Sequence, residues 1–451
     1  MPPKKKAEAK ALPKAKVRAT KQQESTTGSR ASRAADLMEY VDKKMDGRAE
    51  LCLASDYSLP YYTKRLPTGI LSLDIKLGGG WPAGAISQII GPKNAGKDYL
   101  IWQTIRQLQG ILGKKLHVLL AQTEMRADRT QAQKVGCAVA LSDGDVETLD
   151  RANIANGRPP FTKEHRAQLK HQIGTIHEAH GYAVEDLYDI ILRGIESRVY
   201  HLVVINSFGS IMSGAEAESE SLREKTYAGT AGPNTQFLHK LNALLTMRTD
   251  EGESRDTCVL GINQIRDDIK NPNKAYKSSG GNALEHAKFV DLFITSGAAH
   301  GKEMMFPSAI GQQQMKDVWG KDVNWEIKKG KAGIHEGERG RYIHQFFKER
   351  NHPSDPIIPV NNANFYLDYA TVGATYGVID VAGSWHTLLG PNGEELLKAN
   401  SKGKFAMMLE EDVLARAEAG DPNSYMNYIR TVCLQRADIN VNYATMFEGE
   451  D

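Results

Sequence analysis

The chain has 451 residues, of which 41% are hydrophobic and 25% are charged, and its formal net charge is +2. This is the composition of a globular protein with room for about two or three domains, and no apolar run approaches the roughly 18 residues that a membrane span needs. Four scattered cysteines without C-x-x-C spacing argue against a disulfide-stapled secreted protein and favour a reducing compartment, expected to be the cytoplasm.

The first 33 residues are basic and polar, with ten Lys or Arg against two Glu. Such a segment cannot bury enough apolar surface to order itself, so we expect a disordered tail. The tail is either a tether for nucleic acid, a targeting signal, or a solvated segment with only loose attraction to polyanions. Leu37, Met38, Val41 and Met45 then recur at helical spacing, which predicts a small docking helix over residues 34–45.

Residues 91–98 read GPKNAGKD and stand between an apolar run at 85–90 and a segment at 99–108 that can form a helix. This is the context of a phosphate-binding loop, because glycines let the backbone wrap around phosphate oxygens and N–H groups at the helix start point at the anion. Lys97 is expected to reach the β- and γ-phosphates. Position 98 should carry a hydroxyl that binds Mg²⁺, but it is Asp98. The competing interpretation, a chance glycine-rich turn, is disfavoured because strand, loop and helix fall in register.

Short apolar runs alternate with helical stretches through the middle of the chain. This pattern predicts an α/β fold with a largely parallel sheet that is covered on both faces. A polar stretch at 142–180 is expected to be an insertion over one edge of the sheet, and the proline-rich patch at 352–359 marks a boundary before a smaller C-terminal domain. The expected strands are 85–90, 116–121, 202–205, 258–262 and 290–294.

Polar residues follow three of these expected strands. Glu124 follows the second strand, where a carboxylate at the carboxyl edge of a parallel sheet can face the γ-phosphate and activate water. Asn206 ends the third strand, at the place where an Asp associated with Mg²⁺ is normally found. Asn263 and Gln264 end the fourth strand, and an amide there can sense a γ-phosphate and relay its presence into the polar loop at 267–279.

The order of GPKNAGKD, TE, LVVINS, GINQIR and SSGGNAL along the chain resembles the RecA family of homologous-recombination ATPases. The resemblance extends to residues 68–84 upstream and 365–409 downstream, and it covers about three quarters of the chain. It implies a RecA-type P-loop ATPase core with a mainly parallel central sheet and a small α/β C-terminal domain. The implied parts are a disordered basic tail (1–33), a polymerisation helix and linker (34–66), the core (67–351), the C-terminal domain (352–430) and a C-terminal tail (431–451).

The resemblance also implies roles for matching residues. Glu124 aligns with the water-activating Glu and Gln264 with the switch glutamine, and together with Lys97 they are the expected catalytic residues. Lys329 and Lys331 match a lysine pair that reaches the ATP of the neighbouring subunit, although a solvated charged face is the competing interpretation. The residues expected to bind ATP are Gly91, Pro92, Lys93, Asn94, Ala95, Gly96, Lys97, Asp98, Tyr99, Asp128, Lys329 and Lys331.

Two loops, at 218–232 and 267–279, match the DNA-binding loops of the family. Base pairing between the strands is expected to read the sequence, so the expected contacts are mainly with the DNA backbone, and Tyr276 either packs on a base or braces its loop. The residues expected to contact DNA are Arg223, Lys225, Arg266, Lys270, Lys274, Tyr276, Gly280, Gly281 and Asn282.

Asp98 and Asn206 both depart from the family pattern, and both positions surround the same Mg²⁺. Members of the family place a hydroxyl at the first position and a carboxylate at the second, whereas here the carboxylate stands first and a neutral amide second. Mg²⁺ is commonly held by one or two carboxylates together with phosphate oxygens. We therefore expect a compensated exchange that preserves ATP·Mg²⁺ binding. The rival hypothesis is a weakened paralogue that forms filaments on DNA without efficient hydrolysis.

The function that the resemblance implies is ATP-dependent assembly on single-stranded DNA, followed by pairing and strand exchange with homologous double-stranded DNA. ATP and Mg²⁺ are the expected cofactors, and the expected partners are the two DNAs and further copies of the chain in a helical filament, with no membrane. A non-hydrolysing filament protein and a RecA-fold helicase are the alternatives. The residues at 365–409 argue against a helicase, because related helicases lack this domain.

Overall fold

A computed structural model describes residues 29–45, 51, 60–123, 128–155, 157, 159–181, 183–208, 231–247, 254–266, 277–278, 281–308, 311–355, 359–419, 421 and 423–443. The chain divides into two units, residues 1–57 and 58–451. In the first unit, α1 (Arg30–Met45) confirms the predicted helix at 34–45. Leu37 and Tyr40 on α1 are about half exposed, at 53% and 54%. The expected disorder of the basic tail concerns residues that lie almost wholly outside the described ranges.

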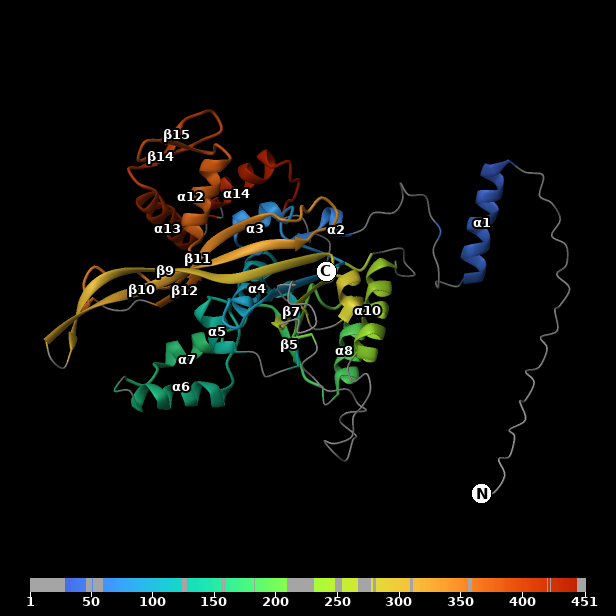
Figure 1. Ribbon diagram of the computed structural model, residues 1–451, viewed down its shortest axis with the longest axis horizontal. Helices are drawn as coiled ribbons and strands as arrows, with labels where there is room; N and C mark the ends of the chain where they lie inside the picture. Colours follow the sequence, from blue (N-terminus) through green and yellow to red (C-terminus); the bar gives the residue numbers. More distant parts are fainter. Residues whose placement is uncertain are drawn as a thin grey trace, which may run out of the picture. The chain divides into compact units, whose positions relative to one another are not determined.

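The second unit is built on a ten-stranded sheet whose main path runs β12-β11-β10-β9-β3-β7-β6-β4-β5, with β8 paired to β7 (Figure 1). The pairs from β9 through to β5 are parallel, and β9 to β12 continue the sheet with antiparallel pairs. The α/β class and the mainly parallel core are thereby confirmed. The strands are β3 (Ile86–Gly91), β4 (His117–Gln122), β5 (Thr175–Ala179), β6 (Leu202–Asn206), β7 (Cys258–Arg266), β8 (Lys277–Ser278), β9 (Val290–Ser308), β10 (Gly311–Lys329), β11 (Arg339–Phe347) and β12 (Pro359–Ala363).

Successive side chains of the central strands point to opposite faces of the sheet, and the core is therefore divided into two layers. Val118 and Leu120 of β4 join a cluster with α4 (Lys97–Leu112), whereas Leu119 and Ala121 join a cluster with α8 (Val184–Glu196) and α10 (Ala231–Thr246). Successive side chains of a strand point to opposite faces. Continuous apolar strands therefore fill both layers, as the sequence predicts for a sheet covered on both faces. The other helices and short strands of the core are α2 (Pro60–Thr63), β1 (Arg65–Leu66), α3 (Leu71–Lys76), β2 (Trp81–Pro82), α5 (Arg129–Lys134), α6 (Asp143–Ala155), α7 (Lys163–Leu169) and α11 (Gly281–Ala287).

The segment at 142–180, which we expected to be an insertion, contains α6, α7 and β5. β5 pairs in parallel with β4 and is the terminal strand of the main path, so the segment supplies the sheet edge itself. Only Ala179 of this strand is buried. Periodicity did not reveal β5 because its other residues are polar or only partly covered.

The last part of the described chain packs a small three-stranded antiparallel sheet with three helices (Figure 1). This bears out the expected small α/β arrangement after the core. The predicted limit at 430 falls within α14, and Tyr443 beyond it donates its hydroxyl to the carbonyl of Gly79 at 2.5 Å. The elements are α12 (Phe365–Thr375), β13 (Ile379–Ala382), β14 (Trp385–Leu389), β15 (Glu395–Ala399), α13 (Lys402–Glu418) and α14 (Tyr425–Arg436).

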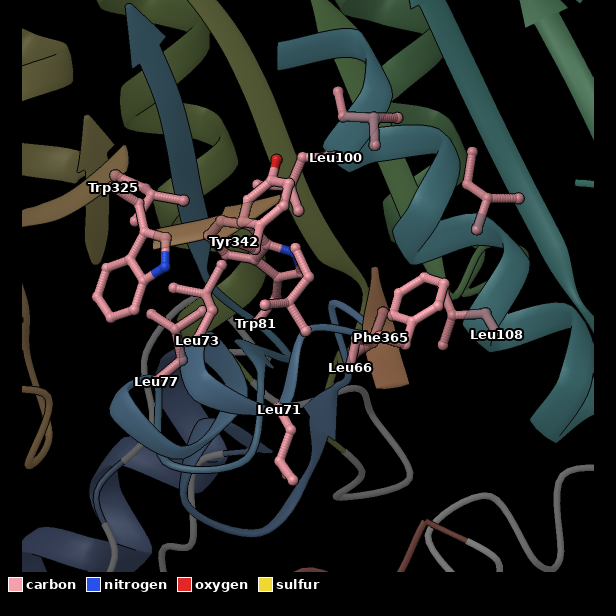
Figure 2. Packing of buried hydrophobic residues seen from close by; sticks show 14 of the residues in the cluster. Leu66, Leu71, Leu73, Leu77, Trp81, Leu100, Leu108, Trp325, Tyr342 and Phe365 are labelled. Carbon is pink, nitrogen blue, oxygen red and sulfur yellow. The ribbon is translucent and has the colours of Figure 1, made fainter. Parts of the chain in front are cut away.

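One cluster of buried side chains joins these parts (Figure 2). Trp81 is a fully buried member of this cluster and donates its indole N–H to the Thr104 hydroxyl of α4 at 3.1 Å. A buried Trp needs such a partner for its N–H. The labelled side chains come from residues 66–81, α4, β10, β11 and the start of α12. The phosphate-loop helix and the C-terminal elements therefore share one apolar core.

Cys137, Cys258 and Cys433 are buried free thiols. None of the helices in the described ranges is both long and apolar enough to cross a membrane.

Asp74 on α3 is a buried carboxyl that makes stability depend on pH. It is 2% exposed and accepts the Thr68 N–H at 2.7 Å, and burial raises its pKa to about 7 against the partial opposition of the Thr68 hydrogen bonds and the Arg430 charge. A carboxyl whose pKa is raised by folding favours the folded state at low pH and loses that contribution as the pH rises toward 7. Asp74→Asn removes this pH dependence. We therefore expect the free energy of unfolding of the variant, relative to that of the parent, to increase by about a few kcal/mol from pH 4 to pH 8.

Urea unfolding of the parent and of D74N at several pH values measures this difference. The matched control is Asp380→Asn, the same substitution at an exposed position of β13. A D74N curve that runs parallel to the parent curve across this window contradicts the prediction.

Candidate functional site

The loop between β3 and α4 has the shape of an anion cradle. Asn94 and Gly96 adopt positive φ angles of 59° and 98°, which turn the backbone sharply before α4 begins at Lys97. A Cβ atom at Gly91 would lie 2.2 Å from the Ile294 carbonyl oxygen, so the start of the loop tolerates no side chain. The loop therefore folds locally as the glycines predict, with the N-terminus of a helix directed at it.

Lys97 points back into this loop rather than into solvent. It is 7% exposed, and its ammonium donates to the carbonyls of Gly91 at 2.9 Å and Pro92 at 2.7 Å. The Ala95 N–H also donates to the Pro92 carbonyl, at 3.4 Å. Two donors thus converge inside the loop, as phosphate binding requires. Lys93, in contrast, is exposed.

Tyr99 belongs to the apolar core rather than to the loop surface. Its side chain is 1% exposed and stacks on His344 of β11, with ring centroids 4.0 Å apart. Burial, together with the positive charge of Lys321, lowers the pKa of His344 to about 4, so this ring is neutral at physiological pH. A contact of Tyr99 with a nucleotide would therefore come from its backbone N–H in the first turn of α4.

The two residues that depart from the family pattern lie in contact. The Asn206 side-chain amide donates to the Asp98 carboxylate at 3.3 Å and to the Gln122 side-chain oxygen at 3.3 Å. Gln122 ends β4 and is 6% exposed, and Asn206 ends β6 directly opposite it in register. The sequence motifs already indicated that Asp98 and Asn206 lie near each other. They did not indicate Gln122, which stands directly before the Thr123–Glu124 pair and belongs to no recognised motif.

The ends of β4 and β6 are tied together beyond this contact. The Thr123 hydroxyl donates to the Ser207 carbonyl at 2.8 Å and accepts the Ser207 N–H at 2.7 Å. Glu124, the expected water-activating residue, follows Thr123 in the sequence and is outside the described residues. Asp128 caps α5 and accepts the Gln131 N–H at 2.9 Å.

The expected switch amides lie beside the loop. In the parallel pairing of β3 with β7, Gln264 stands opposite Gly91 and Asn263 opposite Ile90. Asn263 is 1% exposed, and its side-chain oxygen accepts the Gln264 N–H at 2.9 Å. The sheet order therefore brings Gln264 to the first residue of the phosphate loop, as expected for a residue that responds to a bound phosphate.

Lys329 and Lys331 are the lysine pair expected to reach the ATP of a neighbouring subunit. Lys329 is the last residue of β10, and Lys331 follows two residues later. Both ammonium groups donate to backbone carbonyls of α11, Lys329 to Glu285 and Lys331 to His286. Burial and the neighbouring charge of Lys331 lower the pKa of Lys329. The two lysines are close to each other and to α11, and a role across a subunit interface stays a prediction.

Most of the expected DNA contacts lie outside the described residues. This holds for Arg223, Lys225, Lys270, Lys274, Tyr276 and Gly280. Arg266 ends β7, and Gly281 and Asn282 begin α11. The second expected loop therefore runs between the strand that carries Gln264 and the helix that contacts Lys329 and Lys331.

The arrangement combines an anion cradle with oxygen donors at one edge of the sheet. β3, β4, β6 and β7 are mutually parallel, so Gly91, Gln122, Asn206 and Gln264, which lie at or near their carboxyl ends, share one edge of the sheet. No group of three or more His, Cys, Asp or Glu residues in the described part of the chain is arranged so that it could hold a metal ion. One carboxylate and one amide suit Mg²⁺, which keeps several waters and takes the rest of its ligands from phosphate oxygens. The donor set at Asp98 therefore fits a metal that arrives with a nucleotide.

No protein-family model matches the chain. Curated proteins similar to it are named Protein RecA. The protein from Bacteroides thetaiotaomicron is 25% identical over 358 residues, which cover 78% of this chain and 84% of that protein. The protein from Francisella tularensis is 25% identical over 395 residues, covering 85% of this chain and 89% of that protein. The protein from Porphyromonas gingivalis is 28% identical over 250 residues, or 53% of this chain and 58% of that protein.

Proposed function

We propose that this chain, which is similar over most of its length to proteins named RecA, is an ATP-dependent DNA recombinase of that family. It assembles as a filament on single-stranded DNA and pairs that strand with homologous double-stranded DNA. The observation that carries the proposal is the convergence of the Lys97 loop, Asn206 and Gln264 at one edge of the parallel sheet. The geometry of the site suits a nucleoside triphosphate. DNA is proposed as the partner because of the similarity to proteins named RecA.

The chain's own residues divide the work at this site. The loop amides and Lys97 bind the phosphates, and Asp98, held by the amide of Asn206, supplies the carboxylate for Mg²⁺. When bound, Mg²⁺ neutralises charge on the β- and γ-phosphates. Glu124 takes a proton from the attacking water, and Gln264 passes the state of the γ-phosphate into the loop at 267–279.

Assembly places the site between neighbouring copies. Lys329 and Lys331 of one copy approach the phosphates of the next, and α1 supplies a helix for docking, since its Leu37 and Tyr40 are exposed. ATP then stabilises the extended filament and hydrolysis releases it. Base pairing between the strands reads the sequence, so the DNA-binding loops contact mainly the backbone. The expected localisation is cytoplasmic, in association with the nucleoid.

The contact between Asp98 and Asn206 favours a second candidate function. The carboxylate lies on the phosphate-loop helix, where it repels the phosphates unless a metal intervenes. A chain that binds ATP and forms filaments on DNA with little hydrolysis is therefore the alternative to an active recombinase. A helicase remains the third possibility, and the C-terminal α/β elements disfavour it.

ATPase activity measured with and without single-stranded DNA, alongside electron microscopy, tests the proposal. We expect DNA-stimulated hydrolysis, filaments that require nucleotide, and joint molecules with homologous duplex. Filaments with very slow turnover would support the alternative, and fork unwinding without filaments would support a helicase.

DNA affinity should fall with salt at a log–log slope of about −0.7 per neutralised phosphate on single strands. A protein that shows no nucleotide-dependent binding to DNA contradicts the proposal.

A further inference from the structure

The phosphate loop is braced from outside by a face of the β9–β10 pair. Lys321 of β10 donates its ammonium to the Asn94 carbonyl at 2.9 Å and to the Ser296 hydroxyl at 3.1 Å. The Ser296 hydroxyl of β9 donates to the same Asn94 carbonyl at 3.3 Å. Two side chains therefore converge on one peptide oxygen at the turn of the loop, and neither belongs to a motif that the sequence analysis singled out.

The pairing of the two strands explains how Ser296 and Lys321 meet. Lys321 stands opposite Ala299, whereas Val323 stands opposite Ser296, so β9 has one extra residue in this interval. Such a bulge re-aims side chains and is common beside functional sites. Val323 lies on the same side, because its methyl group is the nearest atom to a Cβ placed on Gly96, at 3.9 Å. The face that carries Ser296, Lys321 and Val323 is thus the face turned to the loop.

The held carbonyl determines where the next N–H points. In a trans peptide the C=O and N–H groups point in opposite directions. With its oxygen held outward by Lys321, the peptide that joins Asn94 to Ala95 directs the Ala95 N–H inward, where it donates to Pro92. The Lys97 ammonium donates to the same Pro92 oxygen. These are the donors that a phosphate oxygen would engage.

We propose that Lys321 is a positioning residue for nucleoside triphosphate binding, which pins the Asn94–Ala95 peptide so that the Ala95 N–H faces the phosphates. Asn94 lies in the left-handed region at a φ of 59°, a conformation that non-glycine residues adopt at a cost. The contact with Lys321 offsets that cost, and the positive charge of the ammonium makes its hydrogen bond to the Asn94 carbonyl stronger than a bond between two neutral groups. This inference rests on the proposed ATP binding and goes beyond it, since it assigns a role to a residue outside the loop and outside the catalytic set.

The test compares the parent protein with Lys321→Met, which keeps the length of the side chain and removes the ammonium. We expect K321M to bind ATP and ADP about ten- to a hundredfold more weakly, as for loss of a charge-assisted hydrogen bond, while its melting temperature without nucleotide stays near that of the parent. Lys321→Arg should restore most of the affinity, because Arg donates to the same two oxygens. The control is Lys316→Met on the same strand, where the exposed lysine donates to the Ala299 carbonyl and the affinity should not change.

Ser296→Ala provides a second route if K321M lowers the melting temperature. It removes one of the two donors to Asn94, and we expect a severalfold loss of affinity. A parent that binds no nucleotide overturns both the proposed function and this inference. A parent that binds ATP while K321M and S296A bind it equally well overturns this inference alone. A loss in K321M that K321R does not restore also overturns it, since only a bulk structural effect would remain.

Discussion

Asp98→Thr combined with Asn206→Asp should restore ATP hydrolysis that either change alone removes. The Asn206 amide donates to Asp98 at 3.3 Å, so N206D by itself replaces a hydrogen bond with two adjacent carboxylates. Two like charges at about 4 Å repel by about 4 kcal/mol at an effective dielectric constant of about 20, and by less where solvent reaches Asp98. D98T by itself leaves Mg²⁺ with no carboxylate from either position. We expect each single variant to lose about a hundredfold in kcat/KM.

The double variant removes both defects. The threonine hydroxyl that D98T introduces can donate to a carboxylate at position 206, and the side chain of Gln122 can rotate its amide so that it donates rather than accepts. Steady-state ATPase at varied Mg²⁺ measures the cycle, and a coupling free energy of about 2 kcal/mol or more marks true compensation. The matched control is Asp380→Asn at an exposed position of β13, which should not couple to Asn206. Single variants that hydrolyse ATP as fast as the parent mean that the two positions are not coupled.

Lys97→Met should abolish measurable nucleotide binding and hydrolysis, with a loss of more than about a hundredfold. The Lys97 ammonium is buried in the loop, where it donates to the neutral carbonyls of Gly91 and Pro92. A phosphate oxygen offers this ammonium a charged acceptor in place of a neutral one, which adds the direct attraction of opposite charges to the hydrogen bond. Removal of the ammonium therefore costs binding energy that the exposed Lys93 does not replace.

Lys93→Met is the comparison for this variant, because it removes one positive charge from the same loop at an exposed position. We expect K93M to lose less than about tenfold, through long-range attraction alone. Fluorescent-nucleotide titration measures both affinities, and the melting temperature of each variant without nucleotide checks folding. Equal losses in K93M and K97M would falsify a specific role for Lys97, since net charge would then explain both.

Sequence by itself determined the local features of this protein. The GPKNAGKD loop, its flanking strand and helix, the five apolar strands and the helix at 34–45 all follow from spacing and residue type over short ranges. The strands could be predicted because a parallel strand covered on both faces is apolar along its length. The departures at Asp98 and Asn206 were visible for the same reason, since each belongs to a short motif beside a recognisable strand.

Only the tertiary structure decided which distant residues meet. Gln122 contacts Asn206, 84 positions away, and Lys321 contacts Asn94, 227 positions away. β5 and the antiparallel strands β10 to β12 contain many polar residues, so hydrophobic pattern alone did not distinguish them from loops. Tyr99 is buried against His344, which β11 contributes from a distant part of the chain. Strand order and a one-residue bulge determine these contacts, and neither leaves a signal in nearby residues, because pairing energy is gained only when remote segments are brought together.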